Sequence, residues 1–157
     1  MRPVITRILV PVDFSEHSDR ALRYAETLAE SLGASLHLLH VLEMPPMWGT
    51  ETYTVDLGTL LDEMTAEATT RMAACRATVP AGLAATTSVE LGRPGDVTAQ
   101  CAVDTHADLI VMGTHGRSGL SHLVMGSVAE RVIRSAPCPV LTVRDKVLAA
   151  MSDTASS

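Results

Sequence analysis

The most distinctive chemical signal in the sequence comes from small residues at fixed spacing. Gly113 and Gly116 are separated by two residues, and Gly126 and Ser127 follow after nine more. Glycine permits a positive φ and a close approach of backbone to a ligand. If residues 126–127 begin a helix, its N–H groups and dipole favour phosphate. The spacing therefore predicts a polyphosphate cradle, although the motifs G-x-x-x-x-G-K-[ST] and G-x-G-x-x-G are both absent.

Predicted strands and helices alternate along the chain around this glycine loop. Short apolar runs predict strands over residues 8–12, 35–42, 84–91, 109–112 and 140–143. Helical periodicity fills each interval between them, the second helix presenting one apolar face over residues 57–75. Such alternation predicts an α/β fold, a single domain with an open parallel five-stranded sheet and helices on both faces.

Local signals set the helix ends. Ser15 is expected to cap the first helix, and Gly33 to end it. Gly95 or Asp96 is expected to cap the third helix. In the fourth helix, the periodicity places three residues on the inner face, namely Val128, Val132 and Ile133.

The composition and charge of the chain disfavour nucleic-acid-binding, membrane-spanning and secreted proteins. The chain has 157 residues, a formal charge of −6 and three cysteines without a C-x-x-C pair. The negative charge disfavours general nucleic-acid binding. No apolar run reaches the ~20 residues that span a bilayer, and no secretory signal core follows the N-terminus. We therefore expect a cytoplasmic protein with reduced thiols, with no membrane or nucleic-acid partner.

In open α/β sheets, ligands bind beyond the carboxyl ends of the strands. Residues 11–13, 41–43 and 113–116 follow predicted strands, so they are the candidates here. Each candidate also has a purely structural interpretation, and both stand at this point. Asp13 or Ser127 could simply be a helix cap, and the glycines could simply be turn residues, without any role in binding. His115 and His122 lack a third ligand at metal-binding spacing, so no metal ligand is assigned. His37 and His40 are expected to be strand histidines, paired or partly exposed, and Cys138 is expected to be a buried thiol.

Four stretches of the sequence resemble the universal stress protein family, in particular its ATP-binding branch. They are Ile-Leu-Val-Pro-Val-Asp-Phe-Ser at 8–15, the strand and glycine loop at 107–120, and residues 126–130 and 137–141. The resemblance spans residues 8–144 and implies a Rossmann-like or flavodoxin-like sheet of order 3-2-1-4-5. It implies a family domain over residues 1–145, which leaves 146–157 as a polar, frayed tail. It also implies homodimers that pair through the last strand, Val140, Leu141, Thr142 and Val143.

The resemblance further implies an ATP site and a divalent cation, Mg²⁺, held mainly by phosphate oxygens and water. Adenine and ribose would lie near Pro11, Val12, Asp13, Val41, Met112 and Gly113. The phosphates would lie near Gly116, Arg117, Gly126, Ser127 and Val128. The function so implied is a dimeric, nucleotide-dependent module of the stress response, with no catalytic residue assigned. A slow ATPase or phosphotransferase using the same pocket is the alternative, and a flavodoxin-like or receiver-like domain is a third class that lacks its usual residues.

Overall fold

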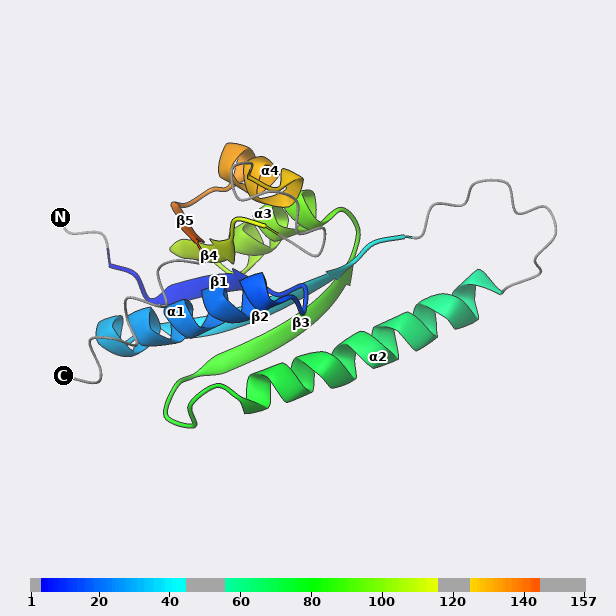
Figure 1. Cartoon of the computed structure of the whole chain (residues 1–157), viewed down its shortest axis with the longest axis horizontal. Coiled ribbons are helices and arrows are strands. Elements are labelled where there is room, and N and C mark those ends of the chain that lie inside the picture. Colours follow the sequence, from blue (N-terminus) through cyan, green and yellow to red (C-terminus); the bar gives the residue numbers. More distant parts are fainter. Residues whose placement is uncertain (1–3, 45–55, 116–124, 145–157) are drawn as a thin grey trace.

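A computed structural model describes residues 4–44, 56–115 and 125–144. Its parallel strands form one sheet of order β3-β2-β1-β4-β5, as expected (Figure 1). The strands are β1 (Arg7–Pro11), β2 (Ser35–Leu42), β3 (Ala85–Leu91), β4 (Leu109–Gly113) and β5 (Val140–Val143). The helices are α1 (Glu16–Leu32), α2 (Leu57–Ala77), α3 (Pro94–Asp104) and α4 (Ser127–Ser135).

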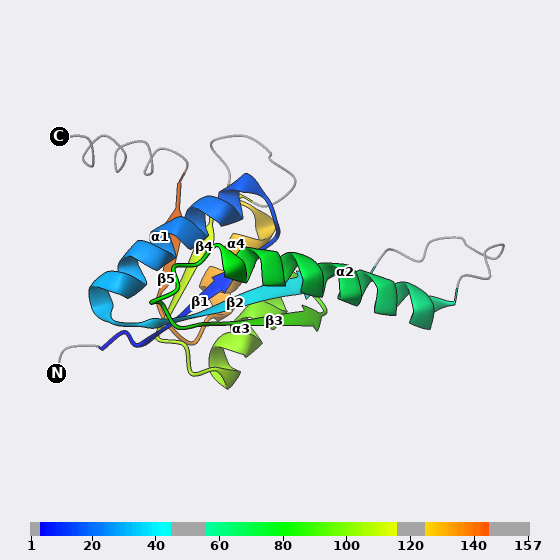
Figure 2. The same cartoon turned by 90° about the horizontal axis from the view of Figure 1, so that it is seen from below.

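Side chains alternate between the two faces of the sheet, and each face has its own core. In β1, Ile8 and Val10 pack with α1 residues such as Leu22, whereas Leu9 packs with Ala102 and Val132 from α3 and α4. Figures 1 and 2 show α1 and α2 on one side of the sheet and α3 and α4 on the other. The central strands are therefore buried on both faces, which explains their continuous apolar runs.

The caps of α1 were predicted correctly. The Ser15 side chain accepts a hydrogen bond from the Ser18 N–H, and Gly33 ends the helix in the left-handed region with φ 67°. For α3 the prediction was wrong, because Arg93 is the N-cap residue, without a side-chain hydrogen bond, and Pro94 is the first helical residue. Proline at that position needs no N–H partner and has the right φ.

Tertiary packing overrides other local signals. Asp96 does not cap α3 but pairs with Arg131 of α4, at 2.6 Å from Oδ1 to Nε. Ile133 is 45% exposed, and Ala129 and Val132 are the buried residues of α4. Cys138 is half-buried rather than buried.

Helix α2 buries less than its periodicity predicts. Only Ala68 and Met72 are fully buried, and in Figure 2 the N-terminal part of the helix extends beyond the sheet. Within the described residues, no helix is long and apolar enough to cross a membrane.

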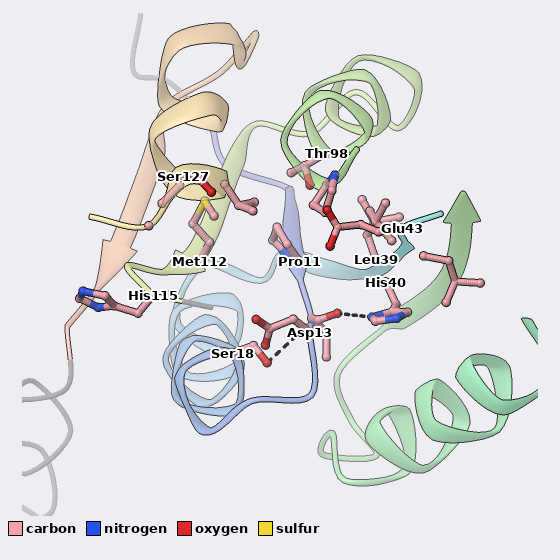
Figure 3. A pocket seen from close by; sticks show the side chains of 18 of the residues that line it. Pro11, Asp13, Ser18, Leu39, His40, Glu43, Thr98, Met112, His115 and Ser127 are labelled. Atoms are coloured by element: carbon pink, nitrogen blue, oxygen red, sulfur yellow. Dashed lines mark hydrogen bonds between the residues drawn. The ribbon is translucent and has the colours of Figure 1, made fainter. Parts of the chain in front are cut away.

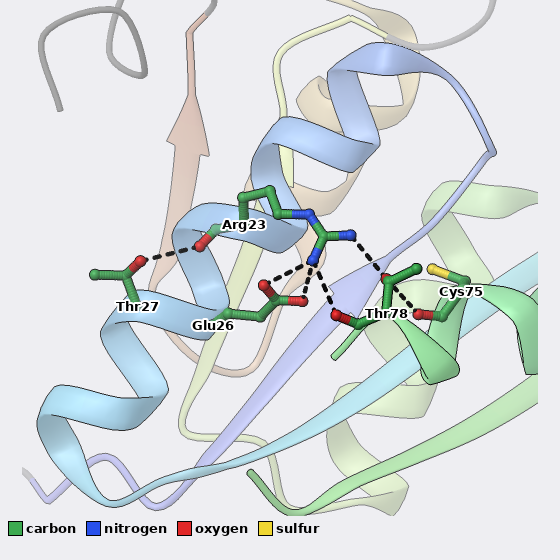
Figure 4. A network of polar contacts seen from close by, with 5 residues as sticks. All are labelled: Arg23, Glu26, Thr27, Cys75 and Thr78. Atoms are coloured by element: carbon green, nitrogen blue, oxygen red, sulfur yellow. Dashed lines mark hydrogen bonds and ion pairs between the residues drawn. The ribbon is translucent and has the colours of Figure 1, made fainter. Parts of the chain in front are cut away.

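The two helices on that face are joined by a polar network (Figure 4). The Arg23 guanidinium of α1 donates to the Glu26 carboxylate at 2.8 Å and to the Thr78 hydroxyl at 2.8 Å. Thr78 in turn donates to the Cys75 carbonyl at 2.7 Å. The network therefore ties the end of α2 to α1.

Candidate functional site

A pocket of about 400 Å³ opens where β1, β2 and β4 end (Figure 3). This volume lies in the range of small-molecule sites. Nine of the eleven residues singled out from the sequence line it, and Gly116 and Arg117 lie outside the described residues. The nine come from separate parts of the chain and are Pro11, Val12, Asp13, Val41, Met112, Gly113, Gly126, Ser127 and Val128.

The pocket has further lining residues. Leu42, Glu43, Thr114 and His115 lie in the strand-end segments named as candidates, although the sequence assigned them no role. Sequence reasoning missed the others, which are Ser18, Leu39, His40, Met64, Pro94, Thr98 and Ala129. Some of them adjoin residues already chosen at strand ends, and that proximity was a usable signal. Pro94 and Thr98 carried no such signal, because α3 reaches the pocket only through its packing on the sheet.

The floor of the pocket is set by contacts of Val12 with β2. The Val12 N–H donates to the Leu39 carbonyl at 2.7 Å. The Val12 carbonyl oxygen lies 2.6 Å from Nδ1 of His40, a ring that is only 4% exposed. These two contacts continue the pairing of β1 with β2 by one residue, so the direction in which the chain leaves the sheet is defined.

Asp13 has a structural role in the turn before α1. Its Oδ1 accepts hydrogen bonds from both the N–H and the hydroxyl of Ser15, and its own N–H donates to the Ser18 hydroxyl. The structural interpretation of this carboxylate therefore holds, whereas the N-cap itself is Ser15. Because Asp13 also lines the pocket, the same turn presents a negative charge there.

Between Asp13 and Ser15, Phe14 has a positive φ of 64°. This conformation is rare for an aromatic residue. Its ring centroid lies 4.4 Å from that of His40, and the Arg71 guanidinium of α2 lies 4.0 Å from the Phe14 centroid. Through Phe14, these two contacts connect Arg71 of α2 to His40 in the pocket lining.

The amino terminus of α4 borders the pocket. Gly126 is its N-cap residue and makes no side-chain cap, while the Gly126 N–H donates to the Thr114 carbonyl at 2.7 Å. Ser127 is the first helical residue, so its interpretation as an N-cap is wrong. The first-turn residues Ser127, Val128 and Ala129 line the pocket. First-turn N–H groups have no acceptor within their own helix, and they and the helix dipole favour an anion.

Gly113 is small for a packing reason. The φ of Gly113 is not positive, so the structure does not use the left-handed backbone conformation that glycine permits. A Cβ on Gly113 would lie 3.1 Å from the His17 carbonyl oxygen. The close approach is therefore to the backbone of α1.

The charge of the described lining is acidic. Asp13 and Glu43 are its carboxylates, and it contains no lysine or arginine. Among the described residues, no group of three or more His, Cys, Asp or Glu side chains could hold a metal ion. A phosphate ligand would therefore rely on backbone amides and a cation that it brings with it.

The two strand histidines of β2 have different environments. His37 contacts the hydroxyls of Thr86 and Ser88 at 2.7 and 2.9 Å, away from the pocket, and burial lowers its pKa. His40 is one of the residues that line the pocket. Both are partnered strand residues, as expected.

This sheet order, with a pocket at its carboxyl edge beside the amino terminus of α4, defines a Rossmann-like α/β protein. The family model described as the universal stress protein family matches residues 5–144. A universal stress protein of Thermus aquaticus, encoded in a QAH/OAS sulfhydrylase 3′ region, is 36% identical over 87% of this chain and 97% of its own. The chain belongs to the universal stress protein family.

Solved structures agree with that assignment. The hypothetical protein MJ0577 of Methanocaldococcus jannaschii superposes with a TM-score of 0.79 and 29% identity, over 91% of this chain and 98% of its own. Two structures at 24% identity share the fold, with TM-scores of 0.58 and 0.56 over 90% of this chain and 98% and 99% of their own. They are a universal stress protein in complex with cAMP and one from Archaeoglobus fulgidus in complex with dAMP.

Proposed function

We propose that this chain binds ATP together with Mg²⁺ in the pocket at the carboxyl edge of the sheet, as a homodimeric regulatory module of the stress response. One observation carries the proposal. Residues chosen from the sequence in four separate segments converge on one cavity of about 400 Å³. That proteins of this fold have been solved with cAMP and dAMP is consistent with an adenine nucleotide as the ligand.

The pocket offers different chemistry to the two ends of a nucleotide. Apolar side chains such as Leu39, Val41 and Met112 suit the flat faces of a base. The first turn of α4, whose N-cap residue Gly126 has no side chain to cap it, suits phosphate. We propose Gly116 and Arg117 of the glycine motif as further phosphate contacts. When bound, Mg²⁺ would neutralise part of the phosphate charge. This matters because Asp13 and Glu43 repel an unneutralised triphosphate.

Two variants at Gly126 test the phosphate site. Gly126 has φ −63° and ψ 153°, an extended conformation that any residue adopts. Asp and Asn are both favoured N-cap residues, so both variants should retain or raise stability. Only Gly126→Asp adds a negative charge beside the phosphates. We expect it to abolish ATP binding in calorimetry with Mg²⁺, while Gly126→Asn retains most of the affinity.

The outcomes are distinct. Nucleotide released from freshly purified protein, together with micromolar ATP binding that only the Asp variant loses, supports the proposal. ATP binding unaffected by Gly126→Asp contradicts the phosphate assignment, and failure of the wild type to bind any adenine nucleotide contradicts the function itself. Incubating the bound sample and measuring ADP separates a regulatory module from a slow ATPase.

The homodimer is proposed through β5. This strand pairs with β4 on one side and is the last strand of the sheet. Val140, Leu141 and Thr142 remain half-exposed in the single chain. An edge strand with such residues favours pairing with a second copy.

A further inference from the structure

The hydroxyl of Thr98 in α3 stands out among the buried polar groups. Thr98 is 1% exposed, and its Oγ1 is the one buried side-chain oxygen or nitrogen, among the described residues, with no hydrogen-bond partner. Other buried polar side chains are paired, for example Glu26 with Arg23 and His40 with Val12. Buried polar groups are nearly always paired, so an exception calls for a reason.

The helix does not supply the missing partner. Threonines in helices commonly donate to the carbonyl four residues earlier. Thr105 does so to Cys101, and Thr69 does so to Thr65, both at 2.7 Å. The corresponding acceptor for Thr98 is the carbonyl of Pro94, and that bond is not made. Valine, which has the same shape, would fill this space without an unpaired hydroxyl.

Thr98 lines the same pocket as the proposed ATP site. Figure 3 shows its side chain on the pocket side of α3, opposite the strand ends. Helix α3 packs against β2, and the lining that these two elements and the segment just after β2 contribute includes the apolar Pro94, Leu39 and Val41 and the acidic Glu43. An acidic and otherwise apolar surface disfavours phosphate and suits a neutral group with a polar edge.

We infer that Thr98 is a base-binding residue, whose hydroxyl forms a hydrogen bond with the polar edge of the nucleotide base. The inference rests on the proposed function, because it names a contact within the same site. A hydroxyl both donates and accepts, so it can pair with a ring nitrogen or an exocyclic amino group. Helical threonine populates two χ1 rotamers, and rotation between them exchanges the positions of hydroxyl and methyl. The bound base therefore gives the hydroxyl the partner that the free protein lacks.

Thr98→Val tests the inference, with Thr105→Val as the matched control in the same helix region. The probes are ATP with Mg²⁺, adenosine and inorganic tripolyphosphate, each titrated calorimetrically. We expect Thr98→Val to lower the affinity for ATP and the affinity for adenosine by the same factor, about tenfold. The affinity for tripolyphosphate should not change, and Thr105→Val should leave the affinities for all three ligands unchanged. The unliganded Thr98→Val protein should melt at the same temperature as the wild type or higher, because an unpaired hydroxyl has been removed.

Each result decides one point. If the wild type binds ATP and Thr98→Val binds it equally well, this inference is overturned and the proposed function stands. Equal weakening of tripolyphosphate would place the hydroxyl at the phosphates and also overturn the inference. If the wild type binds neither ATP nor adenosine, the proposed function and the inference both fail.

Discussion

Nδ1 of His40 lies 2.6 Å from the carbonyl oxygen of Val12, in the floor of the pocket. A carbonyl can only accept, so Nδ1 carries the proton and donates. The same Val12 donates its N–H to the carbonyl of Leu39. Through these bonds β2 holds the residue that follows β1, and with it the turn that carries Asp13.

His40→Leu should therefore be costly. It leaves the Val12 carbonyl without its partner, and we expect a loss of about 1–3 kcal/mol in the free energy of unfolding. ATP affinity should fall as well, because Asp13 follows Val12 directly. Urea unfolding and calorimetry would measure the two effects. As a control, His37→Leu removes bonds to the partly exposed Thr86 and Ser88 and should cost less; equal losses would contradict a special role for His40.

Gly113→Ala should destabilise the fold without any ligand. The added Cβ would lie 3.1 Å from the His17 carbonyl oxygen and 3.2 Å from its Cβ, so α1 must shift. We expect a loss of about 1–3 kcal/mol. Gly82→Ala is the matched control, because no atom lies within 4 Å of its Cβ and its φ is not positive. Thermal unfolding should show a lower melting temperature for the first variant only, and two equal shifts would refute the packing role.

Asp108 should make stability depend on acid pH. Hydrogen bonds from the N–H and hydroxyl of Thr6 and the N–H of Arg7 hold the pKa of Asp108 below its ordinary value of 3.8. A lowered pKa contributes stability above that value, and the contribution disappears as the pH falls through the folded pKa.

Asp108→Asn should accordingly be less stable than the wild type at about pH 6, with the difference closing as the pH falls below 3.8 and through the lowered pKa of Asp108. Urea unfolding at several pH values would measure it. The control is Asp62→Asn, at an exposed carboxylate of α2. A difference that persists unchanged at acid pH would show that the charge of Asp108 is not responsible.

Thr142→Lys should separate the proposed dimer. Lysine on an edge strand opposes pairing with a second strand, because it would bring two like charges together. Light scattering should give twice the chain mass for the wild type and the single chain mass for the variant. Thr87→Lys places the same residue on β3, at the opposite edge, and should remain dimeric. A wild-type monomer, or a dimer lost only in the control, would contradict the assignment to β5.

Much of the fold could be predicted from the sequence because its signals are local. Apolar runs marked the strands, and the chemistry of Ser15 and Gly33 marked the ends of α1. Capping and periodicity act within a few residues, so no knowledge of distant segments was needed. The spaced glycines, with their flanking strands, likewise pointed to the carboxyl edge of the sheet.

Tertiary structure alone decided which other side chains reach that edge. Asp96 pairs with Arg131 because α3 and α4 lie together, and Gly113 must be small because α1 crosses it. The pocket gains His40 and Thr98 in the same way, from elements whose local patterns resemble ordinary core. These contacts depend on how separate elements pack against one another, and no short-range pattern in the sequence records that packing.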